Sequence, residues 1–151
     1  MDTFNSVNEI LNFAIQAEQE AVEFYTGLAA NSKNSQMQKV FEEFAQEEMG
    51  HKARLLKILE TGIMETSKEE VLDMKVTDYL AHVTVSPNMT YADALVVAMK
   101  KEKAAFKLYL TLSGRVKNSE MKELFMSLAQ EESKHKLRFE LEYDENVLKE
   151  N

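Results

Sequence analysis

The sequence predicts an all-α fold, a bundle of four long helices, and three observations support this prediction. Apolar residues recur at intervals of three and four residues instead of alternating, which is the spacing of one helix face. The 151 residues include only 4 Gly and 1 Pro, which argues against a turn-rich all-β fold. Apolar residues make up 44% of the chain, enough to bury a core. We expect one domain over residues 1–151.

Each predicted helix opens on a residue whose side chain can cap a helix N-terminus. Ser6 with Glu9 and Thr90 with Asp93 have the spacing of a capping box. The four expected helices run from Ser6 to about Ala30, from Asn34 or Ser35 to Thr61–Gly62, from Thr90 to Ser113–Gly114, and from Ser119 (or Asn118 before it) through Leu141 and as far as Leu148.

The connections between these helices predict the topology. Short connections join the first helix to the second and the third to the fourth, which makes two antiparallel hairpins. Residues 63–89 form a long crossover with Pro87 near its end, and we expect short helices within it at Ser67–Met74 and Thr77–His82. One such crossover between the second and third helices is the ferritin-like connectivity. The alternative is a disordered linker between two separate hairpins, each of which would bury little apolar surface.

Composition excludes several classes of function. The sequence has no Cys, which excludes disulfides, thiolate metal sites and cysteine nucleophiles. Lys and Arg number 18 against 26 Asp and Glu, and this net charge of −8 argues against binding to nucleic acid or to an anionic membrane. The N-terminus lacks the basic start of a signal peptide, and no apolar run approaches the ~18 residues of a membrane span. We expect a soluble cytoplasmic protein.

The two predicted hairpins are copies of one another. Residues 11–55 align with residues 95–139 without a gap, at an offset of 84, and 18 of the 45 positions are identical. The block Ala45–Glu48 recurs as Ala129–Glu132, and His51 recurs as His135. Two hairpins of equal length, related by an approximate twofold axis, can place equivalent residues at equal depth.

Carboxylates and imidazoles interrupt the apolar stripes that should face the core. The stripe on the second helix is Met37, Phe41, Phe44, Glu48, His51, Leu55 and Ile58, and that on the fourth is Met121, Phe125, Leu128, Glu132, His135 and Phe139. The first helix places Glu18 among Leu11, Ala14, Ala21, Val22 and Tyr25, and the third places Glu102 among Leu95, Ala98, Ala105, Phe106 and Tyr109. Glu18 and Glu48 lie equally far from the first turn, as do Glu102 and Glu132 from the second, so we expect the four carboxylates in one layer.

Four ionised carboxylates in an apolar layer require positive charge, and the inner stripes carry no Lys or Arg. Two divalent cations would supply it while the imidazoles stay neutral. Mixed oxygen and nitrogen ligands favour Fe or Mn over Ca or Mg. One Glu from each of two helices plus Glu-x-x-His from each of the other two is the arrangement of di-iron and di-manganese bundles. We therefore predict a metal site of Glu18, Glu48, His51, Glu102, Glu132 and His135.

Other polar residues fit this site less well. Glu47 and Glu131 precede the ligand carboxylates but point toward Arg54 and Arg138, so we interpret them as peripheral. His82 lies in the crossover and is interpreted as structural or exposed. Tyr25 and Tyr109 lie two turns from Glu18 and Glu102, where each is either a core residue or a donor to a ligand carboxylate of the other hairpin. The alternative to metal is a vestigial repeat with protonated or water-bridged carboxyls.

At these positions the sequence resembles the rubrerythrin branch of the ferritin-like superfamily. The segments that carry the resemblance are Glu18–Tyr25, Glu48–His51, Glu102–Tyr109 and Glu132–His135, and it extends over all four helices. The resemblance implies a homodimer with a non-haem di-iron site that cycles between diferrous and diferric states. It implies reduction of hydrogen peroxide, or of dioxygen, in defence against oxidative stress.

Two departures from the rubrerythrin pattern qualify this expectation. Rubrerythrins carry a C-terminal rubredoxin domain with four Cys, whereas this chain has no Cys and ends after the fourth helix, so we expect an external electron-donor protein. The family also has a seventh carboxylate three residues after the third-helix Glu, where this sequence has Ala105. That difference argues against a redox-linked ligand switch and against strong peroxidase activity.

Our hypothesis for the mechanism gives each ligand a role. Glu48 and Glu132 bridge or clamp the two ions, Glu18 and Glu102 are terminal or bridging, and His51 and His135 each bind one ion. Two alternatives remain at this point. One is a ferroxidase or iron-handling protein with Fe(II) as its substrate, and the other is a structural bundle that metal stabilises without catalysis.

Overall fold

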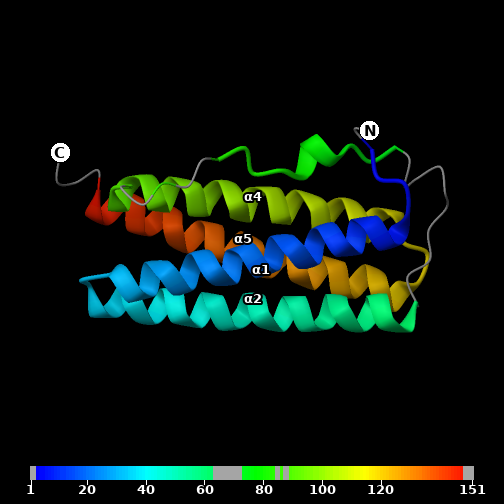
Figure 1. Cartoon of the computed structure of the whole chain (residues 1–151), viewed down its shortest axis with the longest axis horizontal. Helices are drawn as coiled ribbons and strands as arrows, with labels where there is room; N and C mark the ends of the chain where they lie inside the picture. Colours follow the sequence, from blue (N-terminus) through cyan, green and yellow to red (C-terminus); the bar gives the residue numbers. More distant parts are fainter. Residues whose placement is uncertain (1–2, 63–72, 84–85, 87–88, 148–151) are drawn as a thin grey trace. The chain divides into compact units, whose positions relative to one another are not determined.

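The computed structural model describes residues 3–62, 73–83, 86 and 89–147, and every regular element in them is helical. The all-α prediction is confirmed. The chain divides into two compact units, an N-terminal unit within Thr3–Met74 and a C-terminal unit from Lys75 onward. Each unit contains one of the two hairpins that the sequence repeat predicts (Figure 1).

The N-terminal unit is a hairpin of two long antiparallel helices, α1 (Val7–Asn31) and α2 (Ser35–Thr61). Both helices begin where their capping residues predict. The Ser6 hydroxyl accepts a hydrogen bond from the backbone N–H of Glu9, and the Asn34 side chain accepts from two N–H groups of the first turn of α2. These caps satisfy N–H groups that have no acceptor within the helix.

Helix α2 ends at Gly62, which adopts the left-handed conformation with φ of 65°. The Gly62 N–H donates to the Ile58 carbonyl, a C-cap that glycine forms without steric cost. The predicted end of the second helix at Thr61–Gly62 is therefore confirmed.

The C-terminal unit repeats this hairpin with α4 (Tyr91–Arg115) and α5 (Ser119–Asn146). Thr90 and Asp93 form the predicted capping box, in which each side chain accepts a hydrogen bond from the other residue's backbone N–H. Asn118 caps α5 as Asn34 caps α2.

The helix boundaries reproduce the offset of the sequence repeat. α4 begins and ends 84 residues after α1, and α5 begins 84 residues after α2. Equivalent residues in the two units therefore occupy equivalent positions on their helices.

The crossover is only partly described. The predicted short helix at Ser67–Met74 lies mostly outside the described residues. The one predicted at Thr77–His82 is a single 3-10 turn, η1 (Val76–Tyr79), which lies against α4 (Figure 1). It ends early because the backbone is already extended at Leu80, with φ of −85° and ψ of 144°. Further along, His82 takes a positive φ of 50°, and its Nε2 lies 2.9 Å from the Thr77 carbonyl oxygen.

The buried faces follow the predicted stripes with one exchange on α2. Ala45 is buried, whereas Phe44 keeps part of its ring exposed and meets the Tyr25 ring edge-on at 6.3 Å. Val22, Ala105 and Phe106 are likewise only half-buried, because they lie at the edges of their stripes. A residue at the edge of a stripe is rotated away from the buried face, because the helix has 3.6 residues per turn whereas the apolar pattern repeats every 3.5 residues.

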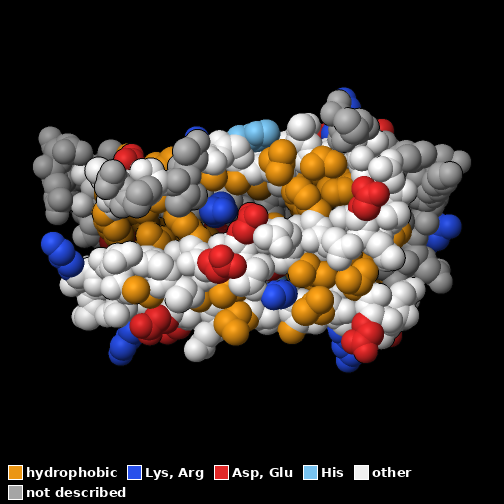
Figure 2. All heavy atoms as spheres, viewed as in Figure 1, with side chains coloured by type: hydrophobic (Ala, Val, Ile, Leu, Met, Phe, Trp, Pro, Cys, Tyr) orange, Lys and Arg blue, Asp and Glu red, His pale blue; other side chains and the backbone are white. Residues whose placement is uncertain are grey.

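Several large apolar side chains remain exposed. They include Met49 and Leu56 on α2 and Leu137 and Leu141 on α5. Figure 2 shows hydrophobic side chains interspersed with acidic and basic ones on the face in view. Within the described residues, none of the helices combines the length and the apolar character needed to cross a bilayer.

Candidate metal centre

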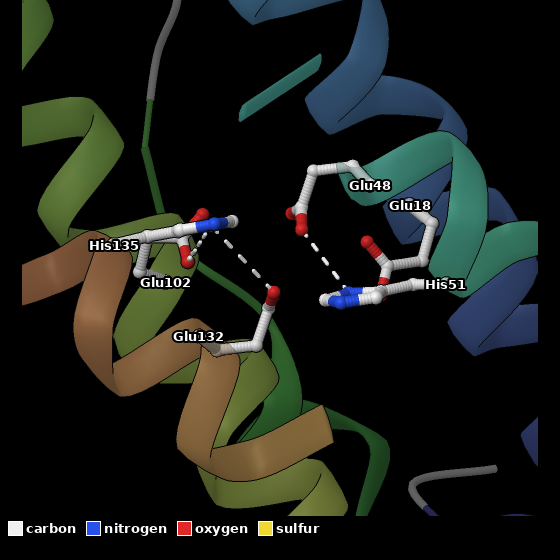
Figure 3. A network of polar contacts seen from close by, with 6 residues as sticks. All are labelled: Glu18, Glu48, His51, Glu102, Glu132 and His135. Carbon is white, nitrogen blue, oxygen red and sulfur yellow. Dashed lines mark ion pairs between the residues drawn. The ribbon is translucent and has the colours of Figure 1, made fainter. Parts of the chain in front are cut away.

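Three predicted ligands of the N-terminal unit converge, and we call them the N-terminal half-site. Glu18 comes from α1, and Glu48 and His51 come from successive turns of α2 (Figure 3). The Nδ1 atom of His51 lies 3.1 Å from a carboxylate oxygen of Glu48 and 3.3 Å from one of Glu18. All three are buried, with exposed fractions of 2% or less. The i, i+3 spacing on α2 places both of its ligands on one face.

The C-terminal unit builds the same cluster from Glu102 on α4 and Glu132 and His135 on α5, and we call it the C-terminal half-site (Figure 3). The Nδ1 atom of His135 lies 3.3 Å from a carboxylate oxygen of Glu102 and 3.9 Å from one of Glu132. These residues are also at most 2% exposed.

The ligand atoms of each half-site are close enough to share an ion. Within each one, an imidazole nitrogen and two carboxylate oxygens lie within 4.8 Å of one another. Two carboxylates and one neutral imidazole carry a charge of −2, which one divalent cation balances. This donor set fits Fe or Mn, which accept oxygen and nitrogen ligands together.

The N-terminal half-site also has a strongly perturbed imidazole. Burial alone would lower the pKa of His51, but hydrogen bonding and charge interactions with Glu18 and Glu48 outweigh it and raise the pKa to about 10. In the absence of metal, the half-site therefore holds a proton at neutral pH, in the position where an ion would place its charge.

One hydrogen bond beside the N-terminal half-site has no counterpart in the repeat. Lys52, which follows His51, donates from Nζ to the Gln19 side-chain oxygen at 2.7 Å and so links α2 to α1. The equivalent of Gln19 is Lys103, and the equivalent of Lys52 is Lys136, which forms an ion pair with Glu140 on its own helix at 3.3 Å. The two half-sites therefore have the same types of ligand residue but differ in the residues around them.

The tyrosines that were interpreted as core residues or hydrogen-bond donors are fully buried. Tyr25 meets the Phe44 ring at 6.3 Å, and Tyr109 stacks on the Phe125 ring at 6.3 Å. Their hydrogen bonds to ligand carboxylates of the other hairpin remain a prediction.

The residues judged peripheral are more exposed than the ligands of the two half-sites. Glu47 is exposed and Glu131 is half-buried, although both are adjacent to a ligand carboxylate in sequence. His82 is exposed in the crossover, as predicted.

Sequence reasoning missed one buried carboxylate, Glu142, which is 4% exposed. Tyr91 donates its hydroxyl to Glu142 at 2.8 Å, and Arg138 lies 3.7 Å from the other carboxylate oxygen. Burial and the contact with Glu142 raise the pKa of Tyr91 above its usual value. The spacing His135, Phe139, Glu142 continues the buried stripe of α5 by one further step, and this was the signal that could have revealed it.

Paired helices that each contribute buried carboxylates, with an imidazole three residues after one of them, define a metal-binding protein of the carboxylate–histidine class. The family model of rubrerythrin matches residues 9–92 and 93–151. The chain therefore belongs to the rubrerythrin family.

Two solved structures resemble the chain over nearly its whole length. One is a hypothetical protein from Pyrococcus furiosus, 27% identical, with a TM-score of 0.71 over 92% of this chain and 89% of that chain. The other is described as a ferritin-like diiron-carboxylate protein from Thermotoga maritima, 24% identical, with a TM-score of 0.74 over 97% of this chain and 99% of that chain. The fold is thus the ferritin-like four-helix bundle. No curated protein matches the sequence.

Proposed function

We propose that the chain is a di-iron oxidoreductase of rubrerythrin type, which reduces hydrogen peroxide with electrons from a separate donor. The observation that carries the proposal is the duplicated, buried cluster of two carboxylates and one imidazole in each unit. Membership of the rubrerythrin family supports the same function.

In this proposal each half-site contributes its ligands to one ion of a pair. The metal ligands are Glu18, Glu48, His51, Glu102, Glu132 and His135. Their four carboxylates need two divalent cations for neutrality, and iron is the metal we propose, with manganese as a chemically similar substitute. When bound, iron supplies Lewis acidity and electrons for cleavage of the O–O bond.

The protein residues supply the environment for that chemistry. The ligand residues are at most 2% exposed, so bulk water has little access to them and their charges interact strongly. Hydrogen peroxide takes up two electrons and two protons to give two molecules of water. The 151 residues include no Cys and so offer no thiolate-bound redox centre of their own, and we propose an electron-donor protein as the source of the electrons.

One observation favours a second candidate, a ferroxidase with Fe(II) as its substrate. The position three residues after Glu102 is Ala105, and the equivalent position after Glu18 is Ala21. Neither offers the additional carboxylate that the rubrerythrin resemblance associates with a redox-linked ligand switch. In that function iron would be oxidised in repeated turnovers and released.

The test is to load the protein with Fe(II) without oxygen and to mix it rapidly with peroxide or, separately, with air-saturated buffer. Diferric absorbance that forms faster with peroxide supports the proposal, whereas equal or faster reaction with dioxygen contradicts it. Oxidation of far more than two iron ions per chain would indicate the ferroxidase. Stabilisation by metal without any oxidation would indicate a structural bundle.

Two neighbouring glutamates provide a matched pair of variants. Glu48→Gln replaces a buried ligand carboxylate, and Glu47→Gln makes the same change at the adjacent exposed residue. We expect Glu48→Gln to abolish the fast diferric signal and Glu47→Gln to retain it. Equal behaviour of the two variants would show that the iron reacts elsewhere.

A further inference from the structure

The hydrogen bond between Tyr91 and Glu142 joins the surface of the C-terminal unit to its buried interior. Tyr91 is 38% exposed at the start of α4, whereas Glu142 is 4% exposed near the end of α5. The phenolic oxygen and the carboxylate oxygen are 2.8 Å apart, an ordinary hydrogen-bond distance at which the phenolic proton is directed at the carboxylate.

Glu142 lies on the same face of α5 as the metal ligand His135. The residues His135, Phe139 and Glu142 have the spacing i, i+4, i+7, and all three are buried. Seven residues of helix correspond to a rise of about 10 Å. From the C-terminal half-site, the Phe139 ring comes first along α5, and Glu142 with its hydrogen-bonded partner Tyr91 comes next.

The repeat shows that the hairpin does not need these residue types for packing. The equivalents of Tyr91, Phe139 and Glu142 in the N-terminal unit are Val7, Leu55 and Ile58. Leu55 is fully buried and Ile58 is 3% exposed, so aliphatic side chains fill the same positions. Burial of a carboxylate costs free energy that burial of isoleucine does not. This difference indicates a chemical role that only the C-terminal unit has.

We propose that Tyr91 is an oxidisable surface relay for the metal centre and that Glu142 is its proton acceptor. This inference rests on the proposed function, because hydrogen peroxide reacting at the metal centre is the oxidant. Tyr91 loses one electron toward that centre and its phenolic proton to Glu142, which leaves a neutral phenoxyl radical and a protonated carboxyl group. One electron from an external reductant restores the phenolate oxygen, and the proton returns to it from Glu142.

Such a relay gives an external reductant a point of contact at the surface. The exposed fraction of Tyr91 allows a donor to reach the phenol directly. Aliphatic residues at the equivalent positions of the N-terminal unit cannot be oxidised in this way, so we expect the relay in the C-terminal unit alone.

The test uses the iron-loaded full chain, treated with a small excess of peroxide in the absence of any reductant. Samples frozen at short times are examined by electron paramagnetic resonance, and peptides from quenched samples are searched for oxidised tyrosine by mass spectrometry. We expect a tyrosyl radical and oxidation products at Tyr91, their loss in Tyr91→Phe, and a reduction of at least several-fold in Glu142→Gln. Tyr143→Phe, a change at a half-buried tyrosine on the same helix, is the control and should change nothing.

Iron oxidation recorded in the same samples separates the two proposals. If peroxide oxidises the iron but no radical forms at Tyr91, the relay is wrong and the proposed function stands. If the iron is not oxidised, the proposed function fails, and with it the link between Tyr91 and the metal.

A metal-free measurement tests the pairing of Tyr91 with Glu142 independently. A one-electron oxidant generated by a light flash in solution should oxidise Tyr91 of the apoprotein faster in the wild type than in Glu142→Gln. Circular dichroism of each variant verifies that the helices remain folded. Equal oxidation rates in the two proteins would overturn the role of Glu142 as proton acceptor.

Discussion

The proton held by His51 leads to a quantitative prediction for metal binding. Its pKa is raised from 6.5 to about 10 because Glu18 and Glu48 stabilise the imidazolium despite its burial. A metal ion coordinated by His51 must displace this proton. At pH 7, which is about 3 units below this pKa, removal of the proton from His51 costs about 4 kcal/mol, at about 1.4 kcal/mol per unit. Metal affinity at this half-site should therefore rise about tenfold per pH unit between pH 6 and 8.

The assay is titration with Co(II), whose visible absorbance reports coordination, at several pH values. Calorimetry in buffers of different ionisation enthalpy gives the number of protons released. The measurement uses the variant His135→Ala, in which only the N-terminal half-site keeps its imidazole. The variant His51→Ala, in which only the C-terminal half-site keeps its imidazole, is measured for comparison. We expect release of about one proton per ion in His135→Ala. An affinity that does not change with pH, or binding without proton release, would refute the reasoning.

The same proton affects the stability of the metal-free protein, and the sign is opposite. Because the folded-state pKa of His51 is higher than the unfolded value, the stabilisation is fully present below pH 6.5 and is lost as the pH rises through about 10. The free energy of unfolding of the apoprotein should therefore decrease between these two pH values, as measured by urea denaturation.

Three further predictions concern stability. Asn118→Ala removes the side-chain acceptor at the start of α5 and should lower the free energy of unfolding by about 1 kcal/mol in urea denaturation, whereas Ser119→Ala should have a smaller effect. Gly62→Ala forces a side chain into the left-handed conformation and should cost about 1 kcal/mol, and no loss would contradict the positive φ of that residue. Chelation of bound iron should lower the Tm, and a free-ion concentration of about 100 times Kd should restore about 2.7 kcal/mol; a Tm insensitive to the chelator would exclude a site specific to the folded state.

The helices could be predicted because their signals are local. Asn34 and Asn118 cap their helices from positions that the sequence alone identifies, and Gly62 ends α2 where a glycine C-cap was expected. The convergence of Glu18 with Glu48 and His51 could also be predicted, since equal distances from a short turn bring residues of a hairpin to the same level. Helical periodicity and hairpin arithmetic are sufficient for such features.

The features that were missed depend on tertiary contacts that periodicity does not encode. Glu142 was not expected to be buried because a carboxylate is ordinarily exposed, and its partner Tyr91 lies 51 residues away in the sequence. The exchange of Phe44 for Ala45 occurs at the edge of a stripe, where spacing alone does not decide which of two neighbouring residues is buried. η1 ends early because the backbone is already extended at Leu80, a conformation with no signal in the sequence.

The stoichiometry of Fe(II) binding in the absence of oxygen tests the central claim most directly. Two duplicated half-sites predict two tightly bound ions per chain in the wild type. They also predict loss of tight binding when Glu48 and Glu132 are both replaced by Gln, while replacement of Glu47 and Glu131 by Gln leaves it intact. Binding of fewer than two ions, or equal binding by both double variants, would contradict a metal pair held by these residues.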